Sequence, residues 1–352
     1  MTNDRRWILV SDTHFGRDPV AEDHAPGPAL ARLFRHLAMG EASTTTLILL
    51  GDFFELLNDA DVDAVRALDA ILPAHKEVVS ALRDAVSKGM RLVVVPGNHD
   101  AALASPEVWA RFHSEFDDGH RVILRAWFAY VPGVLYAEHG HQHHDVNRMP
   151  TLLNTRTGSA DPSIPPLAAV GIKRKLVTLL ESWRYERQSE RPAYKQLLRE
   201  EALRQDLPQT VVGSLHRISR FRLLQMAARV LGVRFGIVKC RNENRARRQA
   251  LKIAEMMDAS GSHVDAVVFG HTHRAEQTRI RAFASYLNTG SWTLDSRADE
   301  FELLDSGQYP YVDITVSGDR VHTELRFTNA LELVKTDPLS TRPQSASSGT
   351  EF

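Results

Sequence analysis

Five short apolar runs along this chain end in acidic, amide or histidine residues. The runs WILV, TLILL, RLVVV, VLYA and DAVVF each hold four consecutive apolar residues, which is typical of buried strands. The segments that follow are SDTH, GDFFE, GNHD, EHGH and GHTH, with Pro96 between RLVVV and GNHD. A single polar segment after a strand is most simply a turn. Five of them, in order and each after a strand, favour a shared metal site.

The spacing of apolar residues divides the chain into three regions. Before Asp145, strand-like runs alternate with helix-like stretches such as 61–88, and after Ser262 the runs ASYLN, PYVDITV and VHTELRF are strand-like. Between them, KRKLVTLLESW, YKQLLREEAL and FRLLQMAARVL place apolar residues at helical spacing. We therefore expect an α/β core over 1–144 and 263–330, interrupted by a large helical cap insertion over 145–262. The Ser-, Thr- and Pro-rich tail 331–352 is predicted to be disordered.

Charge separates the same regions. The whole chain has a formal net charge of −1, yet the predicted insertion carries 22 Lys and Arg against 11 Asp and Glu. The insertion is therefore strongly basic and the core acidic. A basic insertion suits an anionic partner, such as a phosphate-containing substrate.

The sequence also excludes several kinds of protein. Cys240 is the only cysteine, which excludes an internal disulfide and a Cys-rich zinc site. The apolar run near the N-terminus is too short for a signal peptide, and no segment reaches the roughly 18 apolar residues of a membrane span. We expect a cytoplasmic protein, with peripheral contact at a membrane as an open alternative.

The predicted strand ends place their polar side chains in a common region. Residues i and i+2 of an extended segment point the same way, which pairs Asp12 with His14 and His271 with His273. Open α/β sheets bind ligands beyond the carboxyl ends of their strands, where we expect all five polar segments to meet. Asp, Asn and His ligands without a thiolate suit Mn, Fe or Zn in a hydrolytic site. Asp52, alone on its strand, is the natural bridge between two ions.

The ordered set SDTH, GDFFE, GNHD, EHGH and GHTH resembles the calcineurin-like metallophosphoesterase superfamily. That resemblance implies a four-layer αββα sandwich around a dinuclear metal centre, with His99 as the catalytic imidazole and Asp100 holding its orientation. His141 is a candidate contact to substrate or ligands, whereas His143 and His144 are expected in a solvated loop or behind the ligands. The ligands implied are Asp12, His14, Asp52 and His273 for one ion, and Asp52, Asn98, His139 and His271 for the other.

The implied activity is hydrolysis of a phosphate ester or pyrophosphate bond. The resemblance implies in-line attack on phosphorus by a metal-bound hydroxide, with no covalent enzyme intermediate. Two divalent ions are required, with Mn²⁺ favoured and Fe, Zn, Co and Mg as alternatives.

Within the superfamily, GDFFELLNDAD resembles a stretch of the UDP-2,3-diacylglucosamine hydrolases, which also insert a helical cap. This implies a nucleotide-linked lipid as substrate, although members of that group carry Arg at the position of His99. The alternatives are a phosphodiesterase or phosphatase acting on cyclic nucleotides, nucleic acid or phosphoprotein, and a non-catalytic scaffold on the same fold.

Two stretches of the insertion leave its partner open. RISRFRLLQMAARVLGVRFGIVK predicts an amphipathic helix that either packs on its neighbours or touches a membrane surface. RNENRARRQALK suits a nucleic-acid backbone, but it has no aromatic residues for base stacking, so nucleic acid is the less favoured partner.

Overall fold

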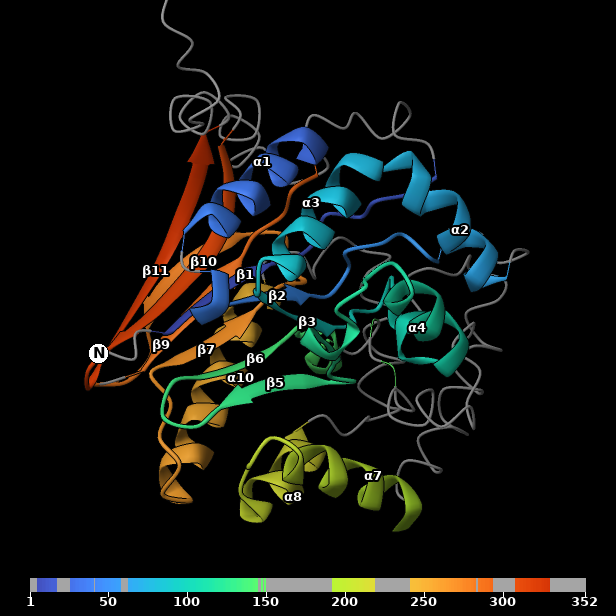
Figure 1. Cartoon of the computed structure of the whole chain (residues 1–352). Coiled ribbons are helices and arrows are strands. Elements are labelled where there is room, and N and C mark those ends of the chain that lie inside the picture. Colours follow the sequence, from blue (N-terminus) through green and yellow to red (C-terminus); the bar gives the residue numbers. More distant parts are fainter. Residues whose placement is uncertain are drawn as a thin grey trace, which may run out of the picture.

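Two β-sheets lie face to face between two layers of helices (Figure 1). The structure is a computed structural model that describes residues 5–17, 26–40, 42–57, 63–144, 147, 149, 192–218, 241–282, 284–293 and 308–329. The predicted α/β sandwich fold is confirmed. The predicted tail at 331–352 and the stretches KRKLVTLLESW and FRLLQMAARVL lie outside the described residues.

The first sheet has the strand order β11-β10-β1-β2-β3-β4. Strands β1 to β4 are parallel, and β10 and β11 form an antiparallel hairpin that pairs with β1. The strands are β1 (Arg5–Val10), β2 (Thr45–Leu50), β3 (Arg91–Val95), β4 (Val122–Leu124), β10 (Gln308–Ser317) and β11 (Arg320–Asn329).

The second sheet has the order β5-β6-β7-β9-β8, with β6, β7 and β9 parallel and the edge strands antiparallel. Its strands are β5 (Phe128–Val131), β6 (Leu135–Glu138), β7 (Ala266–Phe269), β8 (Ala275–Arg279) and β9 (Ser285–Thr289). Strands β5 and β8 were not predicted from the sequence. Strand β5 has four residues, and the sequence AEQTR of β8 has none of the apolar pattern of a buried strand.

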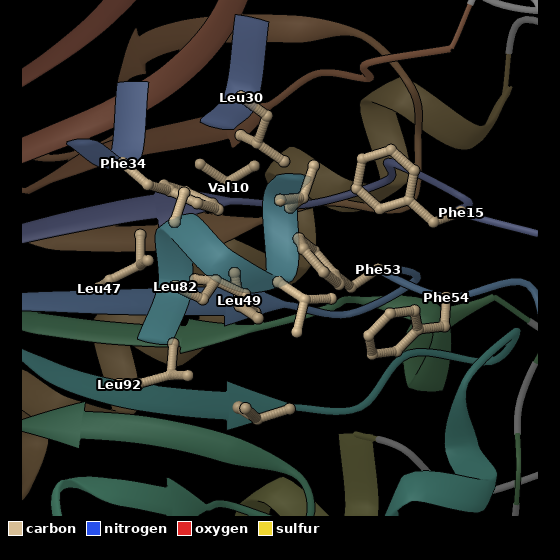
Figure 2. Close-up of a cluster of buried hydrophobic side chains, with 14 of the residues drawn as sticks. Val10, Phe15, Leu30, Phe34, Leu47, Leu49, Phe53, Phe54, Leu82 and Leu92 are labelled. Atoms are coloured by element: carbon tan, nitrogen blue, oxygen red, sulfur yellow. The ribbon is translucent and has the colours of Figure 1, made fainter. Parts of the chain in front are cut away.

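Four helices cover the outer face of the first sheet. They pack on alternate residues of its strands, such as Val10, Leu47 and Leu92, while the residues between them face the second sheet (Figure 2). Because both faces of these parallel strands are covered, each appears in the sequence as an unbroken apolar run. The helices are α1 (Pro26–Met39), α2 (Ala64–Ala74), α3 (Lys76–Ser87) and α4 (Pro106–His113).

The helical stretch expected over 61–88 is divided in two at His75, between α2 and α3. Pro73 has no N–H to donate near the end of α2. The ring of His75 is buried and its Nε2 donates to the carbonyl of Gly16 at 2.8 Å. This bond ties the junction between the helices to the loop that follows β1.

Helices α7 (Pro192–Leu203), α8 (Gln209–Ile218) and α10 (Arg241–Ala259) belong to the region predicted as an insertion. Ile253 and Met257 of α10 lie in one buried cluster with Val267 and Phe269 of β7. The described helices therefore form the outer layer of the second sheet. The domain boundaries at 145 and 262 stay a prediction.

Gln205, just after α7, closes the open edge of β5. Its side chain accepts from the amide of Tyr130 and donates to the carbonyl of Phe128, both at 2.9 Å. An unpaired strand edge is thus satisfied by a side chain in place of another strand. Among the described helices, none has the length and apolar content to cross a bilayer.

Candidate metal centre

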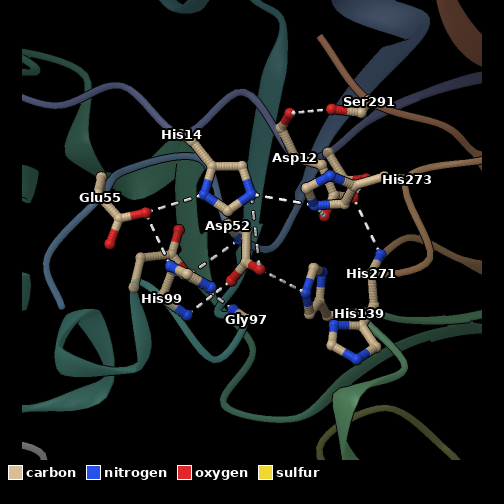
Figure 3. Close-up of polar contacts among 12 residues, drawn as sticks. Asp12, His14, Asp52, Glu55, Gly97, His99, His139, His271, His273 and Ser291 are labelled. Carbon is tan, nitrogen blue, oxygen red and sulfur yellow. Dashed lines mark hydrogen bonds and ion pairs between the residues drawn. The ribbon is translucent and has the colours of Figure 1, made fainter. Parts of the chain in front are cut away.

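Six of the seven predicted metal ligands meet at the carboxyl ends of strands of both sheets (Figure 3), and the seventh, Asn98, lies in the loop after β3, next to His99. Two sets of three predicted ligands each place their ligand atoms within 4.8 Å of one another. A third set combines two predicted ligands, His14 and Asp52, with His99. The predicted ligands follow β1, β2, β3, β6 and β7, and are Asp12, His14, Asp52, Asn98, His139, His271 and His273.

Asp12, His14 and His273 form the first group of ligands. Nε2 of His273 lies 3.1 Å from Oδ1 of Asp12 and 3.2 Å from Nε2 of His14. Nδ1 of His14 bonds to Glu55, which leaves Nε2 turned toward the other two ligands. The arrangement suits a small divalent ion held by one carboxylate and two imidazoles.

Asp52, His139 and His271 form the second group, with Nε2 of His139 at 2.9 Å from Oδ2 of Asp52. Nδ1 of His139 donates to the carbonyl of Leu50 at 2.9 Å, which fixes the ring and leaves Nε2 for a ligand bond. Asp52 Oδ2 also lies 3.9 Å from Nε2 of His14. Asp52 therefore lies between the two groups, as expected for a bridging carboxylate.

Three buried atoms of the predicted ligands have no hydrogen-bond partner in the described structure other than another predicted ligand. They are Oδ1 of Asp12, Oδ1 of Asn98 and Nε2 of His139, although Asp12 and His139 have close neighbours in the site. Leaving buried polar atoms unpaired is costly, and each of these is a good metal ligand. The residues present therefore fit two divalent ions.

Backbone strain is concentrated at the ligands. Five non-glycine residues of the site adopt the left-handed region, with φ of 55° at Asp12, 48° at His14, 51° at Asp52, 65° at His271 and 57° at His273. Such conformations cost about 1–3 kcal/mol each and persist where the surroundings fix them, most often at functional sites.

Gly97 allows the loop after β3 to approach the loop after β2. A Cβ at this position would lie 2.1 Å from Oδ1 of Asp52 and 2.6 Å from its amide nitrogen. Only glycine fits this position without displacing the central carboxylate.

The charges of the site are strongly coupled. Burial by itself raises the pKa of Asp52, but His139 and His99 outweigh it and hold that pKa well below the usual value. Burial lowers the pKa of His139, and Asp52 and Asp12 raise it to about 10. In the metal-free site, protonated imidazoles therefore balance the negative charge of two carboxylates. Bound metal cations would supply this positive charge instead.

His99 lies beside the ligands without belonging to either predicted ligand set. Its amide donates to Oδ1 of Asp52 and its Nδ1 donates to Oε2 of Glu55, both at 2.7 Å. Burial lowers the pKa of His99, but Asp52 and then Glu55 raise it to about 9. The imidazole is therefore a proton donor at neutral pH, with 31 % of its side chain exposed.

Glu55 is a residue of the site that was not predicted from the sequence. It accepts from His14 at 3.0 Å as well as from His99. Burial raises its pKa, but the bonds from His14 and His99 lower it to about 2. The signal available in the sequence was its position in GDFFE, three residues after Asp52 and directly after two aromatic residues.

Asp100 does not orient the His99 ring as predicted. Its carboxylate is buried and accepts from the backbone amides of Gly97, Phe53, Asp52 and Phe54, at 2.7, 2.8, 3.2 and 3.3 Å. Asp100 thereby joins the two loops that carry the ligands. A short carboxylate one residue after His99 reaches these amides, whereas Glu55 reaches the ring.

His141 lies where the sequence places it, close to the second ligand group. Its ring centroid is 5.4 Å from that of His139 and 6.4 Å from that of His271. It is buried, and neither ring nitrogen makes a hydrogen bond in the described structure. His141 is therefore available to a ligand bound at this group.

His143 and His144 lie behind the ligands. His144 Nδ1 and Asn147 Nδ2 lie 3.1 and 3.0 Å from Nε2 of His271. His143 is buried and its Nε2 contacts the carboxylate of Glu138. Of the two expectations for this pair, the position behind the ligands is the one observed.

The family model for calcineurin-like phosphoesterases matches residues 6–275. A search of curated proteins finds no match.

Several solved structures are similar to this chain. A dimetal phosphatase from Danio rerio is 12 % identical, with 92 % of this chain and 96 % of that chain covered and a TM-score of 0.42. Vacuolar protein sorting 29 from Cryptosporidium parvum is 10 % identical, with 93 % and 98 % covered and a TM-score of 0.31. A protein of unknown function from Aquifex aeolicus is 18 % identical over 38 % and 60 % of the two chains, with a TM-score of 0.21.

The family model spans more than half of the chain and contains all five ligand-bearing strand ends. The chain therefore belongs to the calcineurin-like phosphoesterase family, and it is a hydrolase of the metallophosphoesterase type.

Proposed function

We propose that this protein hydrolyses a phosphodiester or pyrophosphate bond at a dinuclear metal centre. The observation that carries the proposal is the position of Asp52 between two groups of ligands, 2.9 Å from His139 and 3.9 Å from His14. Two divalent ions would bind to the ligand sets predicted from the sequence, with Mn²⁺ favoured and Fe, Zn, Co or Mg as alternatives. Bound there, they supply charge neutralisation at phosphorus and activation of water.

His99 serves as the general acid. Its ring is partly exposed beside Asp52, and its Nδ1 is held by Glu55, so Nε2 is the atom that delivers a proton to a leaving oxygen. In the metal-free site, Asp52 and Glu55 raise the pKa of this ring to about 9, and the bond to Glu55 does not involve a metal ligand of either set. His141, buried with both nitrogens free of hydrogen bonds in the described structure, serves as a contact to the bound phosphate.

The basic region supports an anionic substrate, and a nucleotide-linked lipid such as UDP-2,3-diacylglucosamine is the specific candidate. Its excess of Lys and Arg over 145–262 also suits contact with an anionic membrane surface. The single cysteine favours the reducing cytoplasm. Cyclic nucleotides, nucleic acid and phosphoprotein are the alternative substrates. A non-catalytic scaffold is less favoured because each predicted ligand position holds a metal-binding residue.

The test compares two substrates on the purified full chain supplied with Mn²⁺. UDP-2,3-diacylglucosamine is incubated beside bis(p-nitrophenyl) phosphate, and products are identified by mass. Release of UMP and the acylated sugar phosphate supports the lipid substrate, and cleavage of the diester alone keeps the chemistry and rejects that substrate. Asp52→Asn is the inactive control, and Asp84→Asn, on the exposed face of α3, is the matched active control. Turnover unchanged in Asp52→Asn contradicts the proposal.

A further inference from the structure

The segment 288–292, which ends β9 and begins the next loop, holds the backbone of Asp12 although it carries none of the predicted ligands. The hydroxyl of Ser291 donates to the carbonyl of Asp12 at 3.2 Å (Figure 3). The amide of Trp292 donates to the same carbonyl at 3.1 Å. All three residues are buried, with at most 1 % of their surface exposed. This segment therefore fixes the position of the first predicted ligand where the chain leaves β1.

The two oxygens of the Asp12 carboxylate have different surroundings. Oδ2 accepts from the hydroxyl of Ser11 and from the amide of His271, the latter at 3.0 Å. Oδ1 lies 3.1 Å from Nε2 of His273, another ligand of the first group, and has no other hydrogen-bond partner in the described structure. Protein donors therefore occupy Oδ2 and leave Oδ1 for an ion.

Gly270 allows the loop after β7 to reach this carboxylate. A Cβ at this position would lie 2.6 Å from Oδ2 of Asp12 and closer still to Oγ of Ser11. The carbonyl of Gly270 accepts from the side-chain amide of Asn288 at 2.8 Å, which joins the loop after β7 to the end of β9. Three segments of the chain therefore meet tightly around Oδ2 of Asp12.

Thr289, the last residue of β9, lies behind Ser11. Its hydroxyl contacts the hydroxyl of Ser11 and lies 3.3 Å from the carbonyl of Phe269. Ser11 has one proton to donate, and the carboxylate of Asp12 is its stronger acceptor, because a hydrogen bond to an ionised group is roughly twice as strong as a neutral one. Ser11 therefore donates to Asp12 and accepts from Thr289. A chain of bonds runs from Thr289 through Ser11 to Oδ2, and all three residues are fully buried.

We propose that Thr289 is a positioning residue of the metal centre, which acts through Ser11 to keep Oδ1 of Asp12 turned toward the ion of the first group. The inference rests on the dinuclear centre of the proposed function. Partners behind metal ligands typically contribute about 10- to 100-fold to metal affinity. Loss of the Thr289 hydroxyl should therefore weaken binding at the first group, whereas the second group, which does not include Asp12, should change less.

Binding of Mn²⁺ to the metal-free full chain, followed by calorimetry, tests this without catalysis. The chains compared are wild type, Thr289→Val, Thr289→Ser and Thr315→Val. Valine has the shape of threonine without the hydroxyl, and Thr315, which pairs with Arg6 at the end of β1 remote from Asp12, is the matched control. We expect one ion to bind at least about tenfold more weakly in Thr289→Val, and both ions to bind as in wild type in Thr289→Ser and Thr315→Val.

A double-mutant cycle distinguishes an action through Ser11 from a separate structural contribution. Ser11→Ala removes the direct donor to Asp12, so we expect it to lose at least as much affinity as Thr289→Val. Adding Thr289→Val to Ser11→Ala should then cost no further affinity, because the bond that Thr289 supports is already absent. Losses that multiply in the double variant overturn the inference. Urea unfolding of the metal-free chains checks the fold of each variant, and if Ser11→Ala does not fold, the comparison of Thr289→Val with Thr289→Ser decides.

The same titration separates this inference from the proposed function. A wild-type chain that binds fewer than two ions contradicts the dinuclear centre, and the inference with it. A wild-type chain that binds two ions, with equal affinities in Thr289→Val, keeps the dinuclear centre and rejects only the role of Thr289.

Discussion

The carboxylate of Glu55 lies 2.7 Å from Nδ1 of His99 and accepts its hydrogen bond. The same oxygen accepts from His14 at 3.0 Å. A single side chain thus connects the proposed acid to a metal ligand. This contact gives Glu55 a positioning role, and it is the basis of two predictions.

Glu55→Gln lowers the pKa of His99 by about one to two units, because the ring loses a negative partner. The alkaline limb of the kcat/KM profile therefore moves to lower pH, while activity near pH 6 changes less. Glu77→Gln, which removes an exposed carboxylate paired with Arg35, serves as the control. An unchanged alkaline limb in Glu55→Gln would show that His99 is not the acid or that Glu55 does not hold it.

The same pair stabilises the metal-free fold over a defined pH range. The pKa of Glu55 is lowered from 4.5 to about 2, so its contribution is complete above 4.5 and is lost as pH falls toward 2. The pKa of His99 is raised from 6.5 to about 9, so its contribution is complete below 6.5 and is lost as pH rises through 9.

Glu55→Gln should accordingly reduce the free energy of unfolding by about 2 kcal/mol at pH 5.5 and by less at pH 10. Urea unfolding of the metal-free variants measures both values. A loss that is equal at the two pH values would mean that the pair contributes through packing alone.

Asp100→Ala removes the acceptor for four backbone amides of the ligand loops. Because buried donors without partners cost about 1–3 kcal/mol each, we expect destabilisation of at least about 3 kcal/mol and weaker metal binding. Thermal unfolding and metal titration check this. Asp118→Ala, at an exposed carboxylate, is the control. A variant as stable as wild type would contradict the structural role given to Asp100.

Gly97→Ala places a methyl group against Asp52 and should abolish metal binding and reduce turnover by at least about 10²-fold. Gly213→Ala is the matched control, because a Cβ there meets no atom within 4 Å and α8 favours alanine over glycine. Metal content and activity of both variants decide the matter. Full metal content in Gly97→Ala would show that the two loops can separate without harm.

The sequence predicted the central strands well because burial on both faces makes them continuous apolar runs. It placed Asp12, Asp52 and His271 just after the ends of strands, and the structure has them there, after β1, β2 and β7. It missed β8 because the edge strand AEQTR has no apolar pattern, and it missed the four-residue strand β5 although FAYV is apolar. It joined α2 to α3 because helical periodicity continues across His75.

The roles of Glu55 and Asp100 could not be read from the sequence for a different reason. Both are carboxylates close to a predicted ligand, and their partners depend on how two separate loops meet. Side-chain reach decides the outcome, since Asp100 stays on the backbone and Glu55 extends to the ring of His99. Such choices arise from tertiary contacts and leave no periodic signal.

The most direct test of the account is the metal content of the purified chain, measured by mass spectrometry together with hydrolysis of bis(p-nitrophenyl) phosphate. We predict two divalent ions per chain, loss of activity when they are removed by a chelator, and recovery when Mn²⁺ is returned. Asp52→Asn should retain fewer ions and regain little activity. A fully active chain without metal, or one that binds two ions equally well without Asp52, would contradict a dinuclear centre bridged by this residue.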